Sequence, residues 1–272
     1  AARALEGLNV KVVQVAGDEA KGIRNHTEKG LGARHSPDLF HVSQEIGKGV
    51  SGPLAGEIKK AEKRLEESSK ETLSQTKKRD EYDNLPKRPP GRRPDFEKRI
   101  AEAAETEEKA KTDLDSAREN MEVAQRARRE IGRCYHPYDP ETGEKQGPDT
   151  VSELLESKFE TISGTVSGVS ERGEKHVEKA HRVVADMVAA IAFFFVMVRQ
   201  YTMNMDLTEL ELAAVNDFLI PGFYLRRAAR NEKDETRRAA IFEKSKELLS
   251  MLGERDGPFS GICEDRTEEL AK

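Results

Sequence analysis

The sequence predicts a mostly helical fold with a small α/β segment at the N-terminus, followed by a long antiparallel helical hairpin and a helical bundle. Only 36% of the 272 residues are hydrophobic, another 36% are charged, and the mean hydropathy is -0.75, which indicates long solvated helices. A β-branched run lies near the N-terminus, and heptad spacing follows on both sides of a proline-rich turn. The predicted domains are residues 1–50, 51–135 and 136–272.

The N-terminal segment has the order strand, helix, strand. Residues 9–16 form a near-continuous β-branched run, which is typical of a strand covered on both faces. Residues 19–29 suit a helix that ends at Gly30 and Gly32, and "PDLFHV" at 37–42 predicts a second short strand. This order is typical of an α/β layer.

Residues 51–135 predict a helical hairpin. The first arm is expected to begin near Pro53 with Ser51 as its cap, and to present an apolar seam to about residue 84. The segment "LPKRPPGRRPDF" contains four prolines and predicts the turn. A second heptad seam follows from Phe96 to Ile131, interrupted only by Glu107 and Arg128. Two such arms joined by about ten residues are expected to pair antiparallel.

The last part of the chain predicts a loop and several helices. Residues 135–149 are rich in Pro, Gly and Asp, and helices are expected near 150–163, 173–202, 207–219, 221–230 and 234–252. The apolar run 183–198 contains Asp186 and is shorter than the roughly 20 residues that a membrane span needs. We interpret it as a buried core helix, with Phe193 to Phe195 in the core.

Charge and cysteine content restrict the classes of function. A net charge of -5 means that any contact with nucleic acid has to come from local basic clusters. Cys134 and Cys263 lie far apart and have no CxxC companion, so neither a disulfide framework nor a zinc finger is indicated, and a cytoplasmic location is expected. The chain begins without Met or a secretory leader, which we interpret as a fragment.

Asp18 has two interpretations. It stands one glycine past the end of the first predicted strand, where functional groups gather in α/β sheets. Aspartate is also among the preferred helix N-caps, and a helix is predicted to start at Glu19. The position alone leaves both a catalytic carboxylate and a cap open.

The surrounding pattern resembles the middle of the catalytic domain of DDE-type bacterial transposases, which have a ribonuclease H-like fold. A strand ending in Gly-Asp is followed by a helix and then by "SPDLFHVSQEIGKG", with Asp38, Phe40 and His41 at the positions of a "D-x-F-H" strand. The segments "CYHPYDPETGEKQ", "AIAFFFVMVRQ" and "FLIPGFYLRRA" look like the all-helical insertion of one group of these enzymes. The likeness extends over about 230 residues in order.

The resemblance implies cleavage and strand transfer of DNA by carboxylates that hold two Mg²⁺ or Mn²⁺ ions about 4 Å apart. It makes Asp18 a catalytic metal ligand, and it implies transposon-end DNA and self-association as partners, without a membrane. The first Asp and the final Glu of the family have no convincing match, because Glu209, Glu211 and Glu264 lie in charge-rich segments. We therefore expect an internal fragment that is inactive by itself.

Two histidines, His41 and His136, are considered as parts of a metal site. His41 either binds a metal, supports another metal ligand, or is a packed strand residue with a hydrogen-bond partner. Cys134 and His136 offer two metal-ligating groups without a second pair.

Two basic clusters are candidates for contact with nucleic acid. Lys87, Arg88, Arg92 and Arg93 crowd the predicted hairpin tip, where they either bind DNA phosphates or keep the tip solvated. Arg226, Arg227 and Arg230 form a second cluster that surface ion pairs can also explain.

Three classes of function remain open on the sequence. The first is a partial DDE-type transposase. The second is a non-enzymatic helical interaction protein, in which the heptads mediate assembly and Asp18 is a cap. The third is a complete nuclease whose remaining carboxylates the sequence does not reveal.

Overall fold

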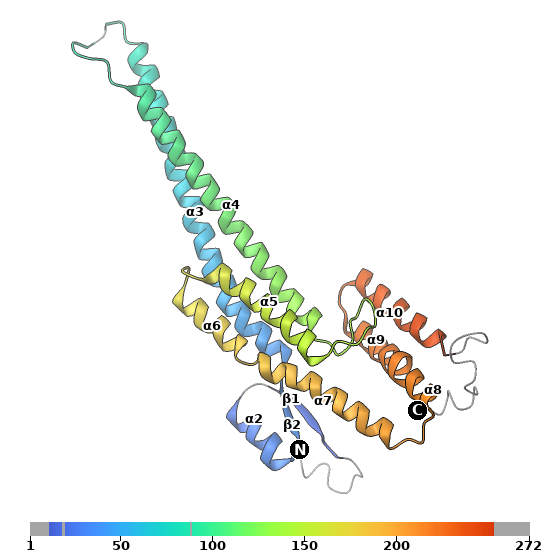
Figure 1. Cartoon of the computed structure of the whole chain (residues 1–272). Coiled ribbons are helices and arrows are strands. Elements are labelled where there is room, and N and C mark those ends of the chain that lie inside the picture. Colours follow the sequence, from blue (N-terminus) through green and yellow to red (C-terminus); the bar gives the residue numbers. More distant parts are fainter. Residues whose placement is uncertain (1–10, 18–19, 88, 253–272) are drawn as a thin grey trace. The chain divides into compact units, whose positions relative to one another are not determined.

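The computed structural model describes residues 11–17, 20–87 and 89–252 (Figure 1). These residues are mostly helical, with one two-stranded sheet. The chain divides into two compact units. Unit 1 comprises Ala1–His41, Glu130–Lys158 and Arg182–Lys272, and unit 2 comprises Val42–Arg129 and Phe159–His181.

The sheet of unit 1 contains two parallel strands, β1 (Gln14–Gly17) and β2 (Arg34–Pro37), in the register Gln14↔Arg34 to Gly17↔Pro37. They are joined by α2 (Lys21–Asn25) and a π-helical turn, η1 (His26–Gly30). The N-cap of α2 is Ala20, so the prediction of a helix that starts at Glu19 and is capped by Asp18 is wrong. The predicted order of strand and helix is present, but β1 begins at Gln14 rather than at residue 9 and ends one residue later than expected, and residues 9 and 10 lie outside the described residues. No residue of β1 is fully buried, so the prediction of a strand covered on both faces is wrong. A Cβ at Gly17 would lie 3.1 Å from Ile23, so this glycine lets α2 approach the strand.

The predicted strand at 37–42 is wrong beyond Pro37, because α3 (Leu39–Asp83) begins there. The Asp38 carboxylate Oδ1 accepts the backbone N–H of Phe40 at 2.9 Å, which is the geometry of a helix N-cap. The predicted helix start near Pro53, capped by Ser51, is also wrong, since Pro53 lies inside α3. The whole segment "EIGKGVSGP", residues 45–53, is helical despite its three glycines and its proline.

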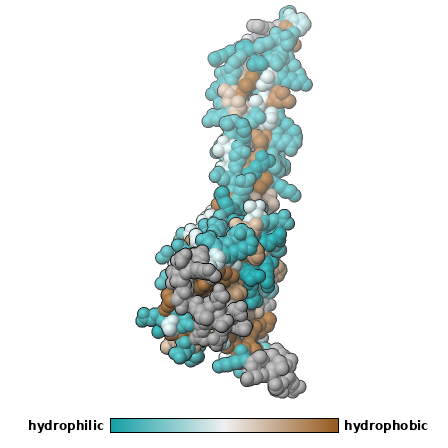
Figure 2. Space-filling view, turned by 90° about the vertical axis from the view of Figure 1, so that its right-hand side faces the viewer, coloured by the Kyte–Doolittle hydropathy of each residue, from teal (hydrophilic) through white to brown (hydrophobic). Residues whose placement is uncertain are grey.

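The long arms of the hairpin run antiparallel in unit 2. Arg128 Nε donates to Ser43 Oγ at 3.1 Å near one end, and Arg93 Nη2 lies 2.9 Å from Asp83 Oδ2 at the other. The second arm is α4 (Phe96–Cys134). Figure 2 shows hydrophilic residues over most of the arms and apolar residues between them. Buried seam residues include Leu54, Ala61, Phe96, Ala110, Leu114 and Ala124, as the heptads predict.

Two glycines allow a close helix crossing in unit 2. A Cβ at Gly49 of α3 would lie 2.8 Å from the carbonyl oxygen of Gly173 in α6 (Glu171–His181). A Cβ at Gly173 would lie 2.7 Å from the Gly49 oxygen and 3.1 Å from Cγ of Pro53. Since Pro53 has no N–H to donate to the Gly49 carbonyl, the proline fits the point where α6 crosses α3. The segment before α6 is α5 (Pro148–Val166).

Unit 1 also contains α7 (Val184–Met203), α8 (Glu209–Ala214), a second π-helical turn η2 (Val215–Leu219), α9 (Ile220–Asn231) and α10 (Glu235–Ser250). Helices α9 and α10 lie side by side around Leu225, Ala229 and Ile241 (Figure 1). The Ser245 hydroxyl donates to the Gly222 carbonyl at 2.8 Å across this pair. The predicted helices are present, with the single helix expected at 173–202 divided into α6 and α7.

Helix α7 is covered by the rest of unit 1 mainly along its first half. Val184, Met187 and Ile191 are buried, whereas Val196 is 49% exposed, so the prediction of a helix buried all round is wrong. The sheet accounts for the covered part, because β2 contacts α7 and Arg24 of α2 lies 3.5 Å from Asp186. By length and composition, Glu171–Met203 holds an 18-residue window apolar enough to cross a membrane, and 22% of that window is buried.

Candidate functional site

The carboxyl ends of β1 and β2 meet at one edge of the sheet. The backbone N–H of Asp38 donates to the Gly17 carbonyl at 2.8 Å, which extends the ladder by one bond beyond the last strand pair. Asp18 follows Gly17 in the sequence but lies outside the described residues. The backbone of Asp38 is therefore one hydrogen bond away from the residue that precedes Asp18.

Asp38 and His41 form a local pair at this edge. The Asp38 Oδ1 atom caps α3, and its Oδ2 atom lies 3.9 Å from Nε2 of His41, with about two fifths of each side chain exposed. The His41 ring packs edge-on against Phe40 at 5.5 Å. The interpretation of His41 as a packed strand residue is wrong, because it stands in the first turn of a helix and is partly exposed.

The described residues do not by themselves form a metal centre. They contain no group of three or more His, Cys, Asp or Glu side chains placed to share an ion. Glu211 is engaged in a capping box with Thr208, whose backbone N–H donates to Glu211 Oε2 at 2.8 Å. Glu209 lies in the first turn of the same helix, and Glu264 lies outside the described residues.

Cys134 and His136 are held in structural surroundings. Burial raises the pKa of the Cys134 thiol and lowers the pKa of His136. The His136 Nδ1 atom lies 2.6 Å from the hydroxyl oxygen of Tyr224, and the two rings pack edge-on at 5.9 Å. His136 therefore serves the packing of unit 1, while Cys134 is a half-buried free thiol.

The basic residues at the hairpin tip differ in whether they form ion pairs. Arg93 pairs with Asp83 at 2.9 Å and with Glu97 at 3.2 Å, and its guanidinium lies over the ring of Phe96. Lys87 and Arg92 are exposed and form no ion pair with the described residues. Arg88 lies outside the described residues. Of the predicted cluster, Lys87 and Arg92 are thus the described side chains available to an anion.

The loop before α5 is a defined structure. Asp139 Oδ1 accepts the N–H of Thr142 at 2.9 Å, and Gly143 has a φ of +76° and a backbone N–H that donates to the Asp139 carbonyl at 2.8 Å. A Cβ at Gly143 would lie 2.7 Å from Leu248 of α10. Tyr138 is buried against α7 and α9, with its ring within 6.0 Å of Phe194, Phe195 and Tyr224.

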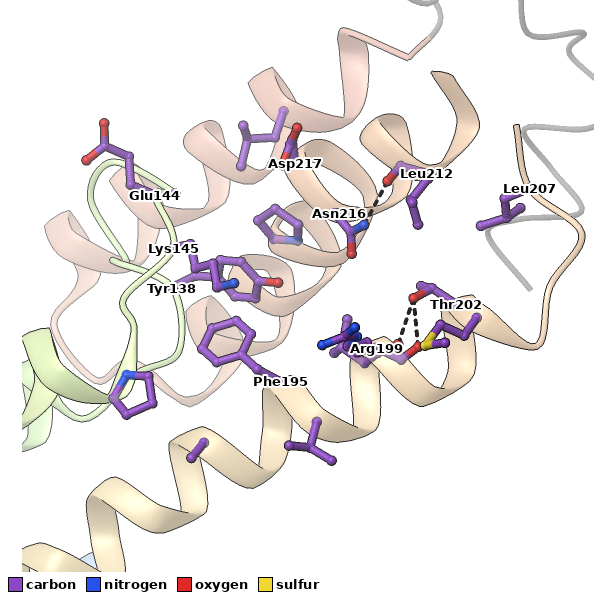
Figure 3. Close-up of a pocket in the computed structure, with 18 of the residues that line it drawn as sticks. Tyr138, Glu144, Lys145, Phe195, Arg199, Thr202, Leu207, Leu212, Asn216 and Asp217 are labelled. Atoms are coloured by element: carbon purple, nitrogen blue, oxygen red, sulfur yellow. Dashed lines mark hydrogen bonds between the residues drawn. The ribbon is translucent and has the colours of Figure 1, made fainter. Parts of the chain in front are cut away.

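A groove of about 1140 Å³ lies between this loop, α7 and the segment from α8 to α10 in unit 1 (Figure 3). The Lys145 ammonium lies over the Phe195 ring at 4.4 Å, and Asn216 Nδ2 donates to the Leu212 carbonyl at 2.9 Å. Arg199 and Asp217 also line the groove. The arrangement combines an apolar floor with charges of both signs.

Helix α9 presents a basic face. Phe223, Arg226, Arg227, Arg230 and Asn231 line a shallow hollow of about 690 Å³. Sequence reasoning identified the three arginines but missed both Phe223 as part of the same face and the groove. Phe223 lies three residues before Arg226 and four before Arg227, and this spacing is the sequence signal that would have placed it on the same face.

Comparison with known proteins found no matching family model, no similar curated protein and no similar solved structure.

Proposed function

We propose that this chain is the middle part of a cytoplasmic DDE-type transposase, with a piece of the ribonuclease H-like core and a helical insertion. The observation that carries the proposal is the parallel β1–α2–β2 unit whose last ladder bond joins Asp38 N–H to the Gly17 carbonyl. In open α/β sheets, functional groups lie beyond the carboxyl ends of the strands. Asp18 follows directly after such an end.

The proposed chemistry requires more carboxylates than the described residues offer. Mg²⁺ or Mn²⁺, when bound by a full set of oxygens, supplies activation of a water or DNA hydroxyl and stabilises the leaving oxygen. Asp18 is the ligand that this chain contributes, and Asp38 is committed to capping α3 through Oδ1. A fragment without further carboxylates is then inactive by itself.

The proposed DNA contact lies at the hairpin tip. Lys87 and Arg92 are exposed there, while Arg93 is held by Asp83 and Glu97. Side chains of this kind bind phosphates without reading the sequence and give a strongly salt-dependent affinity. In this proposal the tip holds transposon-end DNA and the long arms mediate self-association.

Asp18→Asn in a longer form of the protein, extended on both sides of this chain, tests the proposal. Asparagine keeps the size and shape of aspartate but is a poor ligand for a hard divalent ion. A metal ligand therefore predicts loss of strand cleavage with unchanged melting temperature and DNA binding. Full cleavage by the variant would contradict the assignment. Asp38→Asn, which keeps the cap of α3, is the matched control and should leave cleavage intact.

A second candidate function, a non-enzymatic helical interaction protein, is favoured by one observation on α3. Leu73 is 70% exposed on an arm whose other large apolar residues mostly face the seam. In this proposal Leu73→Glu weakens self-association measured by sedimentation, while Leu114→Pro abolishes it by breaking the arm. A chain that sediments as a monomer at every concentration would count against this candidate.

A further inference from the structure

Helix α9 has two faces of opposite character. Leu225 and Ala229 are buried against α10, while Phe223 is 42% exposed. Phe223 and the three arginines Arg226, Arg227 and Arg230 stand at positions i, i+3, i+4 and i+7, which places them on one side of the helix. The exposed face therefore consists of one aromatic ring followed by three guanidinium groups.

The three arginines carry uncompensated charge. None of them forms an ion pair with the described part of the chain, and α9 itself contains no acidic residue. The arginines of the neighbouring α10 differ, since Arg237 lies 3.5 Å from Glu232 and Arg238 lies 3.5 Å from Glu235. A cluster of three free guanidinium groups in a chain of net charge -5 is a local site for an anion.

The aromatic ring decides which polyanion fits. Guanidinium groups bind phosphate oxygens, and a solvent-exposed ring one turn away can stack on a base only where that base is unpaired. In a duplex the faces of the bases are stacked on one another. A duplex therefore offers phosphates to the arginines but no base face to the Phe223 ring. We propose that this face of α9 binds a single strand of nucleic acid, with the arginines on phosphates and Phe223 on a base. The inference does not depend on the metal chemistry proposed for the sheet edge.

Fluorescence anisotropy with a labelled oligothymidylate of about 20 nucleotides, longer than a typical single-strand site of about 4–16, tests the proposal in EDTA. The expected result is tighter binding to the single strand than to the same strand paired with oligodeoxyadenylate. Phe223→Ala should weaken single-strand binding about 5- to 150-fold, because loss of one stacked base has that effect. Replacing the three arginines together by Gln should reduce the slope of log K against log salt by about 2.

The chain offers matched controls for both changes. Arg126, Arg129 and Arg133 of α4 are also exposed and spaced along one side of a helix, but they have no aromatic residue among them and are flanked by Glu122 and Glu130. Their replacement by Gln removes the same charge and should leave the affinity within about 3-fold of the original, since context-dependent scatter is of that size. Phe242→Ala removes another exposed ring, which already lies under the Lys246 ammonium at 4.8 Å, and should have no effect.

Several results would overturn the inference. The first is equal affinity of the original chain and of the triple Gln variant for the single strand. The second is a loss of affinity in the α4 control as large as in the α9 triple variant. The third is an affinity for the duplex that equals the affinity for the single strand and does not change in Phe223→Ala. Binding to vesicles containing phosphatidylserine in preference to the oligonucleotide would assign the face to a membrane surface instead. Far-ultraviolet circular dichroism confirms that each variant folds, and Phe223→Leu serves as a second variant that keeps apolar bulk without the aromatic face.

Discussion

His136 and Tyr224 are 88 residues apart in the sequence and share a 2.6 Å hydrogen bond between Nδ1 and the phenol oxygen in unit 1. The bond ties the loop after α4 to helix α9. Burial lowers the pKa of His136 and raises the pKa of Tyr224, so both groups are neutral in the folded protein near neutral pH.

Tyr224→Phe should destabilise the fold by about 1–3 kcal/mol, because it leaves a buried histidine nitrogen without its partner. Since the pKa of His136 is lowered below its usual 6.5 on folding, the unfolded state binds the proton more readily and stability falls as the pH drops below that value. Urea unfolding between pH 8 and about pH 5, a range that brackets the usual histidine pKa, measures both effects. Tyr201→Phe, at a 65% exposed site, is the control and should change little.

Gly143→Ala should destabilise unit 1 by about 1–3 kcal/mol, because alanine disfavours positive φ and its Cβ would meet Leu248. Gly147→Ala in the same loop meets nothing within 4 Å and should be close to neutral. Thermal melts of the two variants give the comparison. Equal melting temperatures would contradict the role assigned to Gly143.

Gly49→Ala and Gly173→Ala should each destabilise unit 2 by about 1–3 kcal/mol, since the added methyl group would collide with the backbone of the crossing helix. Gly56→Ala, also in helix α3, places its Cβ with nothing within 4 Å and should stabilise the helix by up to about 1 kcal/mol through helix propensity. The same substitution is therefore predicted to have opposite effects on stability at Gly49 and Gly56 of one helix. A shift of melting temperature in one direction for all three variants would exclude the close crossing.

Glu45 is expected to make the stability of unit 2 depend on pH in the acidic range. Hydrogen bonds from Lys48 and His176, with Lys179 nearby, lower the pKa of this carboxyl group from 4.5 to about 2. A carboxyl group with a lowered folded pKa stabilises the protein above its unfolded pKa, and the contribution is lost as the pH falls toward the folded value. Glu45→Gln should therefore cost on the order of 1–3 kcal/mol at pH 7. The difference from the original chain should narrow between pH 4.5 and about 2, and a constant difference would refute the assignment.

Arg92→Gln should lower the affinity for duplex DNA more than Arg93→Gln does, because Arg93 is occupied by Asp83 and Glu97. If Arg92 contacts one phosphate, its loss reduces the slope of log K against log salt by about 0.9. Titrations of a labelled duplex at several salt concentrations measure the slope. Identical slopes for both variants would remove the tip from the proposed DNA contact.

The helical hairpin was predictable because its signals are local and repeated. Leu54, Ala61, Ala110 and Leu114 recur at heptad spacing and are all buried. The start of α3 was not predicted, because "PDLFHV" and Pro53 each carry a local signal against helix. The four-residue spacing of Val42, Ile46, Val50 and Leu54, all buried in one helix, outweighs those signals.

The candidate sites were predictable only where they consist of one short segment. The run around Arg92 and Arg93 and the arginines of α9 are visible in the sequence. The ion pairs that occupy Arg93 are not, since Asp83 is ten residues away on the other arm. The groove beside Phe195 combines a loop, α7 and four later elements, α8, η2, α9 and α10, and such a juxtaposition depends on packing that no local pattern contains.

Helices α3, α4 and α5 each begin in one compact unit and end in the other, so both units are assembled from non-adjacent stretches of chain. A protease that nicks the exposed hairpin tip after Lys87 or Arg92 would split the polypeptide into two fragments, each of which supplies part of both units. The fragments should therefore elute together under native conditions and separate only in denaturant, as in a non-covalent complementation pair. Tip-nicked chain would then remain a single species in every assay that does not unfold it.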